Sequence, residues 1–430
     1  MVRPSQVGIV LLGLGVVGGG VARSLLEKSE SFAQRVGVPL VLRKALVRDR
    51  LRPRSVSLDP TLITTDPEEA LATDSDIVVE VIGGERPAYE LIREGLKRGR
   101  YVVTANKEVM AKHGPELLAA AGDAGTDILY EASVGGGIPI VSPLKRDLSA
   151  NDISSLRAII NGTTNYILTR MSREGADFGS ALAQAQALGY AEAQPDNDVE
   201  GHDAVYKLAI LASLAFHTRV QPEDVYREGI TRLSPRDFRY AAELGYAIKL
   251  LAVARRSEAG VQARVHPALV ASEELLARVD GVLNAVQVEG DLTGRVLFQG
   301  AGAGALPTTS AVMADVLDAA RHIAEGSRPS AWRYTADVTI QPIAEIISRY
   351  YIRLEVEDRP GVLAGFARCF GDNGVSIASV IQKESDEQAQ TTEIVVMTHA
   401  SKEAAVQASL AAMEEARAVR QVGNVIRVED

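Results

Sequence analysis

Short apolar runs alternate with helix-like stretches along the first third of the chain. Each run is long enough for one buried strand, and each stretch between two runs is long enough for a helix that crosses back over a sheet. This alternation predicts a parallel, doubly wound α/β sheet. The predicted strands are Val7–Leu12, Val41–Val47, Asp76–Val81, Tyr101–Thr104 and Asp127–Glu131, and the predicted helices are Val17–Lys28, Arg86–Arg98 and Glu108–Ala121.

The pattern changes after Asn151. A longer helical block is followed by strand-like runs, which predicts a mixed α+β domain. A glycine-rich turn at Gly300–Gly304 then opens a helix, Thr308–Ile323, that is long enough to pack against the first sheet. The helical block covers Ser180–Phe216 and Pro235–Tyr246, and the strand-like runs are Leu250–Ala254 and Val282–Glu289.

The C-terminal part of the chain predicts a separate unit with the order βαββαβ, as in ferredoxin-like domains. A linker that contains Pro329 and Pro342 precedes it. The predicted elements are Tyr350–Val356, Val362–Phe370, Val375–Gln382, Thr391–Thr398, Lys402–Ala416 and Val422–Val428. We therefore expect a first domain from residues 1–148 and 303–326, a second from residues 149–302 and a third from residues 349–430.

Composition and charge narrow the class of protein. With 430 residues, of which 46% are hydrophobic and 24% charged, the chain is a folded globular protein with roughly three domains. Its formal net charge of −10 disfavours nucleic acid or an anionic membrane as a partner, because both reward clustered lysine and arginine. Cys369 is the only cysteine, which excludes an intrachain disulfide, argues against a cysteine-ligated zinc site and fits a reducing cytoplasm.

An uncharged run from Pro4 to Ala22 superficially resembles a signal peptide. The run contains six glycines, which would make a poor apolar helix, and three of them have a nucleotide-binding spacing. We therefore expect no export and a cytoplasmic protein.

A glycine fingerprint, Gly13-Leu-Gly15-Val16-Val17-Gly18, follows the first predicted strand. In a Rossmann-type βαβ unit the first glycine makes the tight turn, the second lets the backbone approach a pyrophosphate and the third lets the helix pack on the sheet. The N-terminus of the next helix offers unpaired N–H groups and partial positive charge to the phosphates. The spacing predicts a dinucleotide site, and glycines that merely tighten the turn are the alternative.

Arg48-Asp49-Arg50 closes the second predicted strand, where the adenosine ribose of a dinucleotide lies. An arginine there pairs with the 2′-phosphate of NADP(H), whereas an aspartate accepts a hydrogen bond from the 2′-hydroxyl of NAD(H). Two arginines against one aspartate favour NADP(H), with NAD(H) possible and a solvated charged loop as a third interpretation.

Two further segments lie where such sheets bind their ligands. Thr104-Ala-Asn106-Lys107 follows the fourth predicted strand, at the carboxyl edge of the sheet, where polar residues face the nicotinamide. Glu131 ends the fifth strand, and the glycines between it and Pro139 let successive backbone carbonyls converge on a hard cation. A hinge between two domains is an equally good interpretation of the second segment.

A carboxylate-rich stretch leads into the longest predicted helix. Asp203 and Lys207 are four residues apart and so share one helix face, for which an exposed salt bridge is the ordinary explanation. The apolar run Leu208–Phe216 that follows predicts instead a buried helix whose polar end meets a cleft. A lysine held there beside a second ammonium group can donate a proton near neutrality.

These segments, in this order, resemble the homoserine dehydrogenase family, in its monofunctional form with a C-terminal ACT domain. The resemblance covers nearly the whole chain. At one position the chain departs from the family pattern, because Gln194 stands before Pro195 where Asp, Asn or Ser is usual. The resemblance also rests on Asn161-Gly-Thr-Thr-Asn165-Tyr, on Gly189–Lys207 and on Gly300-Ala-Gly-Ala-Gly304-Ala-Leu-Pro307-Thr308.

The resemblance implies NAD(P)-dependent interconversion of L-aspartate 4-semialdehyde and L-homoserine, in threonine and methionine biosynthesis. Lys207 and Lys107 would be the catalytic lysines, with Lys207 as the proton donor to the carbonyl oxygen. Glu192, Asp198 and Asp203 would bind the substrate. Two ammonium groups beside the carbonyl agree with the chemistry, because charge develops on that oxygen when hydride reaches the carbon.

The resemblance further implies a sodium-type monovalent cation, bound by Glu131 with the backbone of Val134, Gly136 and Ile138. Gly302 would close over the nicotinamide. The second domain would bind substrate and support dimerisation.

The stretch from Asn161 to Asn165 is dense in hydroxyls and amides, so it either caps a helix or lines the substrate pocket. We favour Thr163 or Thr164 as the cap.

Asp358, Gly361 and Asn373 are the candidate effector residues of the last unit. Glycine there permits backbone conformations in which main-chain groups hold a small zwitterion. The resemblance to an ACT domain implies an amino-acid effector, with threonine, the end product of the pathway, as the natural one. A purely structural dimerising module is the alternative, because edge strands pair readily, and a homo-oligomer, dimer or tetramer, is expected.

Two other classes of function stay open. A regulator that binds dinucleotide and amino acid without turnover would need neither the lysine pair nor the carboxylate cluster. Another ACT-bearing dehydrogenase, of the phosphoglycerate or prephenate type, would use a histidine base, and of the six histidines only His202 lies inside a motif. We therefore expect a small-molecule substrate, with no nucleic acid or membrane as partner.

Overall fold

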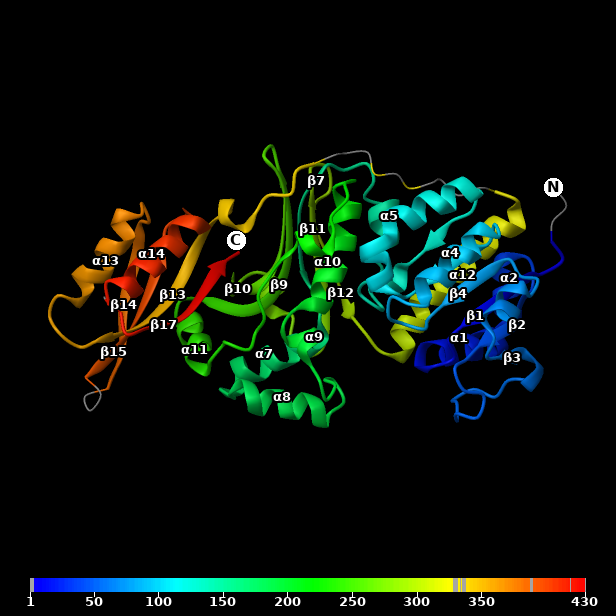
Figure 1. Ribbon diagram of the computed structural model, residues 1–430, viewed down its shortest axis with the longest axis horizontal. Coiled ribbons are helices and arrows are strands. Elements are labelled where there is room, and N and C mark those ends of the chain that lie inside the picture. The colour runs from blue at the N-terminus through cyan, green and yellow to red at the C-terminus, as the bar shows by residue number, and fades with distance from the viewer. Residues whose placement is uncertain are drawn as a thin grey trace. The chain divides into compact units, whose positions relative to one another are not determined.

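The computed structural model of the chain describes residues 4–327, 332, 334, 338–386, 390–417 and 419–429. Pro329, part of the predicted linker, lies outside these residues. The chain forms two compact units, each assembled from three separate stretches (Figure 1). Unit 1 comprises Met1–Ser154, Tyr206–Pro222 and Asn284–Val338, and unit 2 comprises Ser155–Val205, Glu223–Leu283 and Thr339–Asp430. The three domain boundaries expected from the sequence stay a prediction.

Unit 1 is built on a parallel sheet of six strands. The strands are β1 (Val7–Leu12), β2 (Leu40–Leu46), β3 (Ile63–Thr64), β4 (Ile77–Glu80), β5 (Tyr101–Thr104) and β6 (Ile128–Leu129), and the helices between them are α1 (Val16–Glu27), α2 (Ser29–Val36), α3 (Pro67–Ala72), α4 (Ala88–Lys97) and α5 (Lys107–Ala124). The strands run in the order β3-β2-β1-β4-β5-β6, and every pair is parallel. The strand order reverses at β1 and β4, which is where doubly wound sheets bind dinucleotides. The predicted doubly wound sheet is confirmed.

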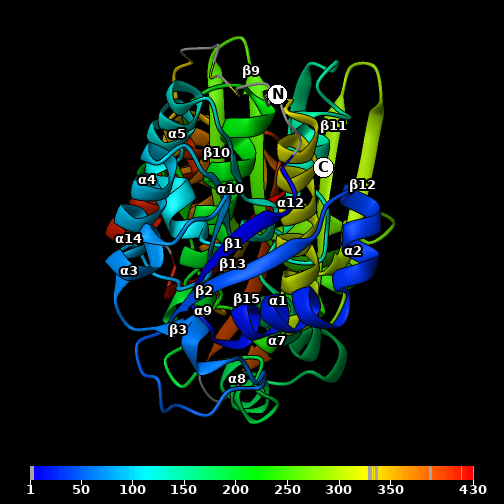
Figure 2. The same ribbon diagram turned by 90° about the vertical axis from the view of Figure 1, so that its right-hand side faces the viewer.

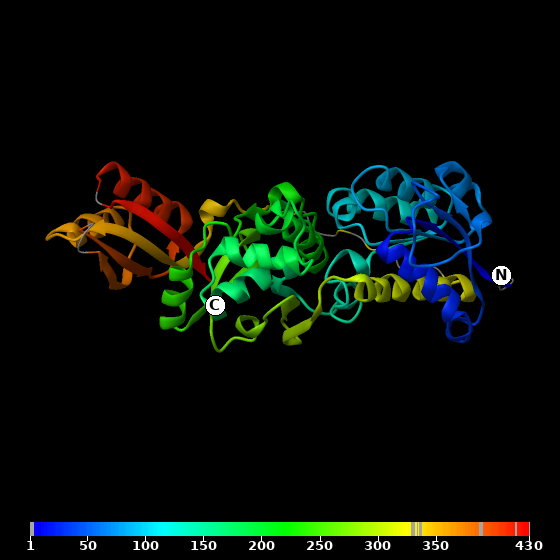
Figure 3. The same ribbon diagram turned by 90° about the horizontal axis from the view of Figure 1, so that it is seen from below.

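Helix α12 (Ala305–Glu325) returns to this sheet from a distant part of the sequence. It packs against α1, β4 and β5, and Figure 3 shows it in yellow beside the blue α1. The two helices meet closely at Gly20, where a Cβ would lie 2.2 Å from Thr309 Oγ1. The predicted packing of Thr308–Ile323 on the first sheet is confirmed, and the helix begins slightly earlier. Figure 2 shows α12 with β1 and β2 of the same unit.

Three short elements of unit 1, α2, β3 and α3, have no counterpart in the sequence prediction. No element was predicted for the stretch that helix α2 occupies. This helix starts after Lys28 without a side-chain cap and buries only Phe32 and Val36, so neither of the usual sequence signals marks it. Strand β3 has only two residues, which is too few to show the alternation of apolar and polar positions that predicts a strand.

The remaining elements of unit 1 are α6 (Val141–Lys145), β11 (Leu283–Gly290) and β12 (Gly294–Ala301). Strand β11 agrees with the predicted run, whereas β12 was not predicted. All of its residues are exposed or half-buried, and its apolar run is too short to mark a buried strand. Helix α10 (His202–Ala215) begins in unit 2 and continues into unit 1.

The middle of the chain forms the first part of unit 2. Its elements are β7 (Ile153–Ile159), α7 (Gly162–Glu174), α8 (Phe178–Ala187), α9 (Asp196–Val199), β8 (Tyr226–Arg227), α11 (Pro235–Glu243), β9 (Tyr246–Ser257) and β10 (Gly260–Ala271). The predicted block Ser180–Phe216 is therefore three separate helices, interrupted at Gly189 and Gly201, which both have positive φ. Strand β10 is fully paired with β9 but was missed, because Pro267 within a run argues against a strand.

The predicted βαββαβ unit is confirmed at the C-terminus. It consists of β13 (Ile347–Glu357), α13 (Val362–Asp372), β14 (Ile377–Asp386), β15 (Thr391–Thr398), α14 (Glu403–Glu415) and β17 (Gln421–Val428), with the short β16 (Ser401–Lys402) beside β13. The antiparallel order is β17-β13-β15-β14. Helices α13 and α14 pack together (Figure 1) over a core that includes Phe366, Phe370 and Val396.

Buried ion pairs join this C-terminal sheet to the rest of unit 2. Strand β17 pairs in parallel with β10, and Arg427 on β17 donates to Glu403 at 2.7 Å and to Glu228 at 2.9 Å. Burial alone would raise the pKa of Glu429, but the charge of Arg264 and the neighbouring groups hold that pKa well below its usual range. Because a buried charge that loses its partner is costly, these pairs fix how the C-terminal sheet sits on β10.

Candidate functional site

The turn between β1 and α1 holds the glycine fingerprint. Gly13 has φ +102°, and its N–H donates to Leu46 O at 3.0 Å. A Cβ on Gly18 would lie 2.0 Å from the carbonyl oxygen of Gly13, whereas a Cβ on Gly15 would have no atom of the described residues within 4 Å. Val16, the first residue of α1, is 72% exposed. The turn is therefore tight, with close packing at Gly18 and open space at Gly15. This arrangement suits a pyrophosphate at the helix N-terminus.

The loop after β2 exposes a run of basic side chains. Arg48, Asp49 and Arg50 are all exposed there. The carboxylate of Asp49 accepts the Leu51 N–H at 2.8 Å, and the Arg54 guanidinium donates to the carbonyl oxygens of Asp49 and Arg50. The carboxylate of Asp49 thus serves its own turn, while the side chain of Arg48 is exposed at the end of β2, where doubly wound sheets bind the ribose end of a dinucleotide.

Glu80, which the sequence analysis did not single out, is a buried carboxylate at the end of β4. It accepts the hydroxyl of Thr104 at 2.6 Å and the N–H of Ile82 at 2.7 Å, and Thr104 Oγ1 in turn accepts the Asn106 N–H at 3.0 Å. Burial raises the pKa of Glu80 even though these hydrogen bonds lower it. The group ties the carboxyl ends of β4 and β5 together. The sequence feature that could have identified Glu80 is a charged residue directly after an apolar run.

Lys107 is positioned by the cap of α5. Asn106 is the N-cap residue: its side-chain oxygen accepts the Val109 N–H at 3.1 Å, and its amide nitrogen donates to Gly84 O at 2.7 Å. The helix therefore starts at Lys107, directly beyond the edge of the sheet.

The two predicted catalytic lysines both belong to unit 1, where Lys107 is the first residue of α5 and Lys207 lies in the second turn of α10. The two helices line one small cavity, to which α5 contributes Met110 and Ala111 and α10 contributes Ile210. Residues three or four apart share a helix face, so Lys107 lies on the face of Met110 and Lys207 lies on the face of Ile210. Both lysines therefore stand on the sides on which α5 and α10 meet.

Lys112 adds a second connection between these helices. Its ammonium lies 5.7 Å from the ring centroid of Tyr206, which precedes Lys207, and pairs with Glu85 and Glu108 at 2.7 Å each. Hydrogen bonds from Lys112 and His113 lower the pKa of Glu85 to about 2. The loop after β4 is thereby joined to α5.

The carboxylate of Glu131 is committed to the main chain. It accepts N–H groups of Ile140 at 2.6 Å, Val141 at 2.9 Å and Ser142 at 2.7 Å, at the start of α6. The N–H of Glu131 donates to buried Asp315 on α12 at 2.8 Å. Any cation in the loop that follows would therefore depend on main-chain oxygens, including those of the predicted Val134, Gly136 and Ile138.

The glycines of that loop permit such a turn. Gly135 and Gly136 have φ +75° and +52°, conformations that favour glycine, and the Gly135 carbonyl accepts the Ile138 N–H at 2.9 Å. A Cβ on Gly136 would lie 2.5 Å from Gly302 O, and the Gly137 N–H donates to Ala301 O at 2.9 Å. The loop that is predicted to bind the cation is thus in direct contact, within unit 1, with Gly302, which is predicted to close over the nicotinamide. Among the described residues, no three His, Cys, Asp or Glu side chains are grouped to hold a metal.

Asn161, rather than Thr163 or Thr164, caps α7. Its side-chain oxygen accepts the Thr164 N–H at 2.9 Å. Its amide nitrogen donates to Asp198 Oδ1 at 2.7 Å and to Asp203 Oδ2 at 2.9 Å, so one neutral side chain holds both predicted substrate carboxylates together. Asp203 and Lys207 are 7% and 9% exposed and share one face of α10, which argues against an exposed surface pair.

Glu192 and Gln194 are exposed in the loop between α8 and α9. The loop's contact with α8 is a hydrogen bond from Gln186 to the main-chain oxygen of Glu192 at 3.0 Å. The carboxylate of Glu192 is therefore not among the buried groups that Asn161 collects.

The predicted effector residues lie at two ends of one helix. Gly361, with φ +91°, is the N-cap of α13, with Asp358 just before it, and Asn373 is the C-cap. The 11 residues of α13 span about 16 Å. One small bound amino acid therefore does not contact all three predicted effector residues of the same chain. Asn373 donates to Cys369 O at 2.8 Å, as a C-terminal residue of the helix does.

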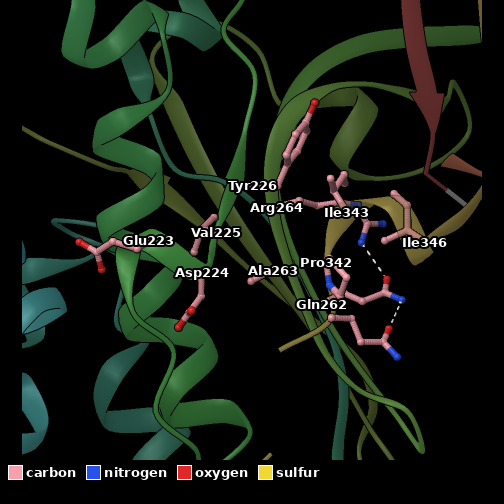
Figure 4. A pocket seen from close by; sticks show the side chains of 11 residues that line it. Glu223, Asp224, Val225, Tyr226, Gln262, Ala263, Arg264, Pro342, Ile343 and Ile346 are labelled. Carbon is pink, nitrogen blue, oxygen red and sulfur yellow. Dashed lines mark hydrogen bonds between the residues drawn. The ribbon is translucent and has the colours of Figure 1, made fainter. Parts of the chain in front are cut away.

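A separate cavity of about 210 Å³ lies in unit 2 between β8, β10 and the segment Gln341–Ile346 (Figure 4). Arg264 donates to Gln262 at 3.1 Å, and Gln262 donates to Gln341 at 2.7 Å along one wall. The cavity contains none of the predicted site residues.

Comparison with known proteins agrees with the resemblance along the whole chain. Residues 13–131 match the NAD-binding domain of homoserine dehydrogenase, residues 139–317 match the homoserine dehydrogenase domain and residues 350–417 match the ACT domain. Homoserine dehydrogenase of Mycobacterium tuberculosis is 46% identical over 98% of each chain. The chain belongs to the homoserine dehydrogenase family. It is accordingly an oxidoreductase that acts on a CH–OH group.

Solved structures of homoserine dehydrogenases have the same fold. The enzyme from Thiobacillus denitrificans superimposes with a TM-score of 0.91, at 43% identity, over 99% of this chain and 98% of that one. A hyperthermophilic archaeal homoserine dehydrogenase in complex with NADPH has a TM-score of 0.62, at 28% identity, over 73% of this chain and 97% of that one.

In the described part of the chain, no helix has both the length and the apolar character that a membrane crossing requires.

Asn161→Ala is expected to raise the KM for homoserine at least tenfold while the KM for the dinucleotide stays within twofold. The variant removes the donor that Asp198 and Asp203 share, and hydrogen bonds to charged groups are worth about 1.5–3 kcal/mol each. Steady-state kinetics with each substrate varied in turn measures both values. Asn151→Ala, at an asparagine that bonds Thr293 N–H in unit 1, is the control, and an equal rise in both KM values would argue against the assignment.

Proposed function

We propose that the chain interconverts L-aspartate 4-semialdehyde and L-homoserine with NADP(H), and that Lys207 exchanges the proton at the carbonyl oxygen. The observation that carries this proposal is the arrangement of α5 and α10. Lys107 and Lys207 stand on the meeting sides of the two helices, and Lys207 follows Asp203 by one turn on α10.

The bound dinucleotide supplies or accepts the hydride at C4 of its nicotinamide. The turn at Gly13–Gly18 would hold its pyrophosphate, and the polar groups at the end of β5 would bind its nicotinamide half. Lys107 stabilises the charge that develops on the substrate oxygen, and Lys207 donates the proton to that oxygen in the reducing direction. In the oxidising direction Lys207 takes the proton from the hydroxyl.

Asp198 and Asp203 hold the substrate through its amino and hydroxyl groups. The shared Asn161 donor is neutral, so it brings the carboxylates together without cancelling their charge. A cationic ammonium group of the substrate complements this pair of carboxylates. Glu192 reaches the substrate only if its exposed loop closes, and this role rests on the family pattern alone.

NADP(H) is the favoured dinucleotide. The carboxylate of Asp49 is used within its loop, and the guanidinium of Arg48 is exposed at the end of β2. The archaeal relative in complex with NADPH supports the same choice.

A sodium-type cation held by main-chain oxygens of Val134, Gly136 and Ile138 belongs to the proposal as well. Glu131 would shape the loop by accepting three main-chain N–H groups.

The ACT domain is proposed to bind threonine as a feedback effector, near Asp358 and Gly361 at the N-terminus of α13. We also propose a homo-oligomer, a dimer or tetramer, for which the exposed strand β12 in unit 1 offers unpaired backbone groups. A cytoplasmic location is supported by Cys369, which is not in a disulfide.

Lys207→Ala is expected to lower kcat for homoserine oxidation at least a thousandfold, because it removes the group that exchanges the proton. NADPH binding, followed by fluorescence titration, should stay within twofold. Lys97→Ala, at an exposed lysine in the last turn of α4, should leave both quantities unchanged. A Lys207→Ala enzyme with near-normal turnover would refute the assignment.

Arg48→Ala is expected to raise the KM for NADP⁺ at least tenfold and to change the KM for NAD⁺ less than twofold. The reason is that only the 2′-phosphate loses a charge-assisted partner. Arg35→Ala on α2 is the matched control. The same loss with both dinucleotides would contradict the pairing.

Threonine is expected to bind the full-length enzyme in an isothermal titration, and Asp358→Ala should weaken that binding at least tenfold by removing a carboxylate partner for the ammonium group. Glu414→Ala, at an exposed carboxylate on α14, is the control. No heat of binding with the unsubstituted enzyme would leave the ACT domain with the structural role alone.

A further inference from the structure

Asn284 is a buried polar residue to which neither the sequence nor the family resemblance assigns a role. It is the second residue of β11 and is 1% exposed. Its side-chain oxygen has no hydrogen-bond partner among the residues that the structure describes. Buried polar atoms are nearly always hydrogen-bonded in native proteins, so an unpaired carboxamide oxygen points to a donor other than the described residues, such as a bound ligand.

The surroundings of Asn284 place this oxygen next to the predicted nicotinamide cover. A Cβ on Gly302 would lie 2.1 Å from both Cγ and Nδ2 of Asn284, so the carboxamide lies directly on the Gly302 backbone. On its other side, Gly302 O is 2.5 Å from where a Cβ of Gly136 would lie. Asn284, Gly302 and Gly136 thus form one continuous cluster within unit 1.

The order of the parallel sheet decides which part of a dinucleotide this cluster faces. The pyrophosphate lies at the turn after β1, and the ribose that carries the 2′-phosphate lies beyond β2. The nicotinamide half must therefore extend the other way, over β4, β5 and β6, which are spaced about 4.8 Å apart. Gly136 belongs to the loop that follows β6. The cluster stands on the nicotinamide side of the sheet.

We propose that Asn284 is a binding residue for the nicotinamide half of the dinucleotide, with its side-chain oxygen accepting a hydrogen bond from the carboxamide NH₂ or a ribose hydroxyl. The phosphates have no hydrogen to donate, and the 2′-phosphate end lies on the other side of β1. The inference rests on the proposed function for the identity of the dinucleotide. The same contact leaves room only for glycine at position 302, since any side chain there would displace the Asn284 carboxamide.

The experiment compares two ligands that differ by the nicotinamide half. NADPH and adenosine 2′,5′-bisphosphate, which lacks that half, are titrated into unsubstituted protein and Asn284→Ala. We expect the Kd for NADPH to rise about tenfold in the variant and the Kd for the bisphosphate to stay within twofold. Equal weakening of both ligands, unchanged NADPH binding, or an effect confined to the KM for homoserine would each overturn the proposal.

A second variant separates a contact from a packing effect. Asn284→Asp keeps an acceptor oxygen and adds negative charge beside the ring. Because the ring of NADP⁺ is positive, the ratio of the Kd for NADPH to the Kd for NADP⁺ should be at least tenfold higher in this variant than in the unsubstituted protein. A purely structural role would weaken both redox forms equally, and that result would contradict the proposal. Asn151→Ala is the control for both comparisons.

Failure of this inference is distinguishable from failure of the proposed function. The unsubstituted protein is first assayed for homoserine-dependent reduction of NADP⁺, and absence of that activity would count against the function. Nucleotide binding needs no turnover, so the comparison of the two ligands tests Asn284 by itself.

Discussion

The position of α5 and α10 beside one small cavity within unit 1 is the constraint on which the proposed chemistry depends. A lysine is a useful proton donor only if it is held at the reacting oxygen, and its long side chain otherwise moves freely in water. Lys107 is the first residue of α5 and Lys207 lies in the second turn of α10, and the next turn of each helix contributes residues to one small cavity. Lys112 reinforces the contact through the Tyr206 ring. The orientation of two flexible side chains is thereby set by two rigid elements.

Hydrogen bonds to carboxylates organise the rest of the site. Glu80 joins the ends of β4 and β5, Glu131 collects three N–H groups at the start of α6, and the amide of Asn161 joins Asp198 to Asp203. In the first two cases the charge is used to hold a loop. In the third case the donor is neutral, so this hydrogen bond does not itself cancel the charge of either carboxylate. Residues of one chemical type thus have different roles, according to what donates to them.

Much of the fold was predictable because the signals are local. Strands β1, β5 and β15 were predicted to the residue, since buried strands of this kind are short apolar runs with clear ends. Strand β10 was missed because Pro267 lies within it, although its neighbour β9 pairs along its full length. Helix α2 was missed because it is short and has no capping side chain. In each case tertiary contacts stabilise an element whose own sequence is a weak indicator.

The sequence by itself determined the glycine turn, the doubly wound sheet, the βαββαβ unit and the family. These follow from spacings of a few residues, over which backbone conformation and periodicity act. Only the tertiary structure decided that the carboxylate of Glu131 serves main-chain amides, that Asn161 rather than Thr163 or Thr164 is the cap, and that Gly302 lies between Gly136 and Asn284. The Asn161 contacts span 37 and 42 residues. Partners so distant in the chain meet only when separate elements pack, and no local pattern records which donor reaches which acceptor.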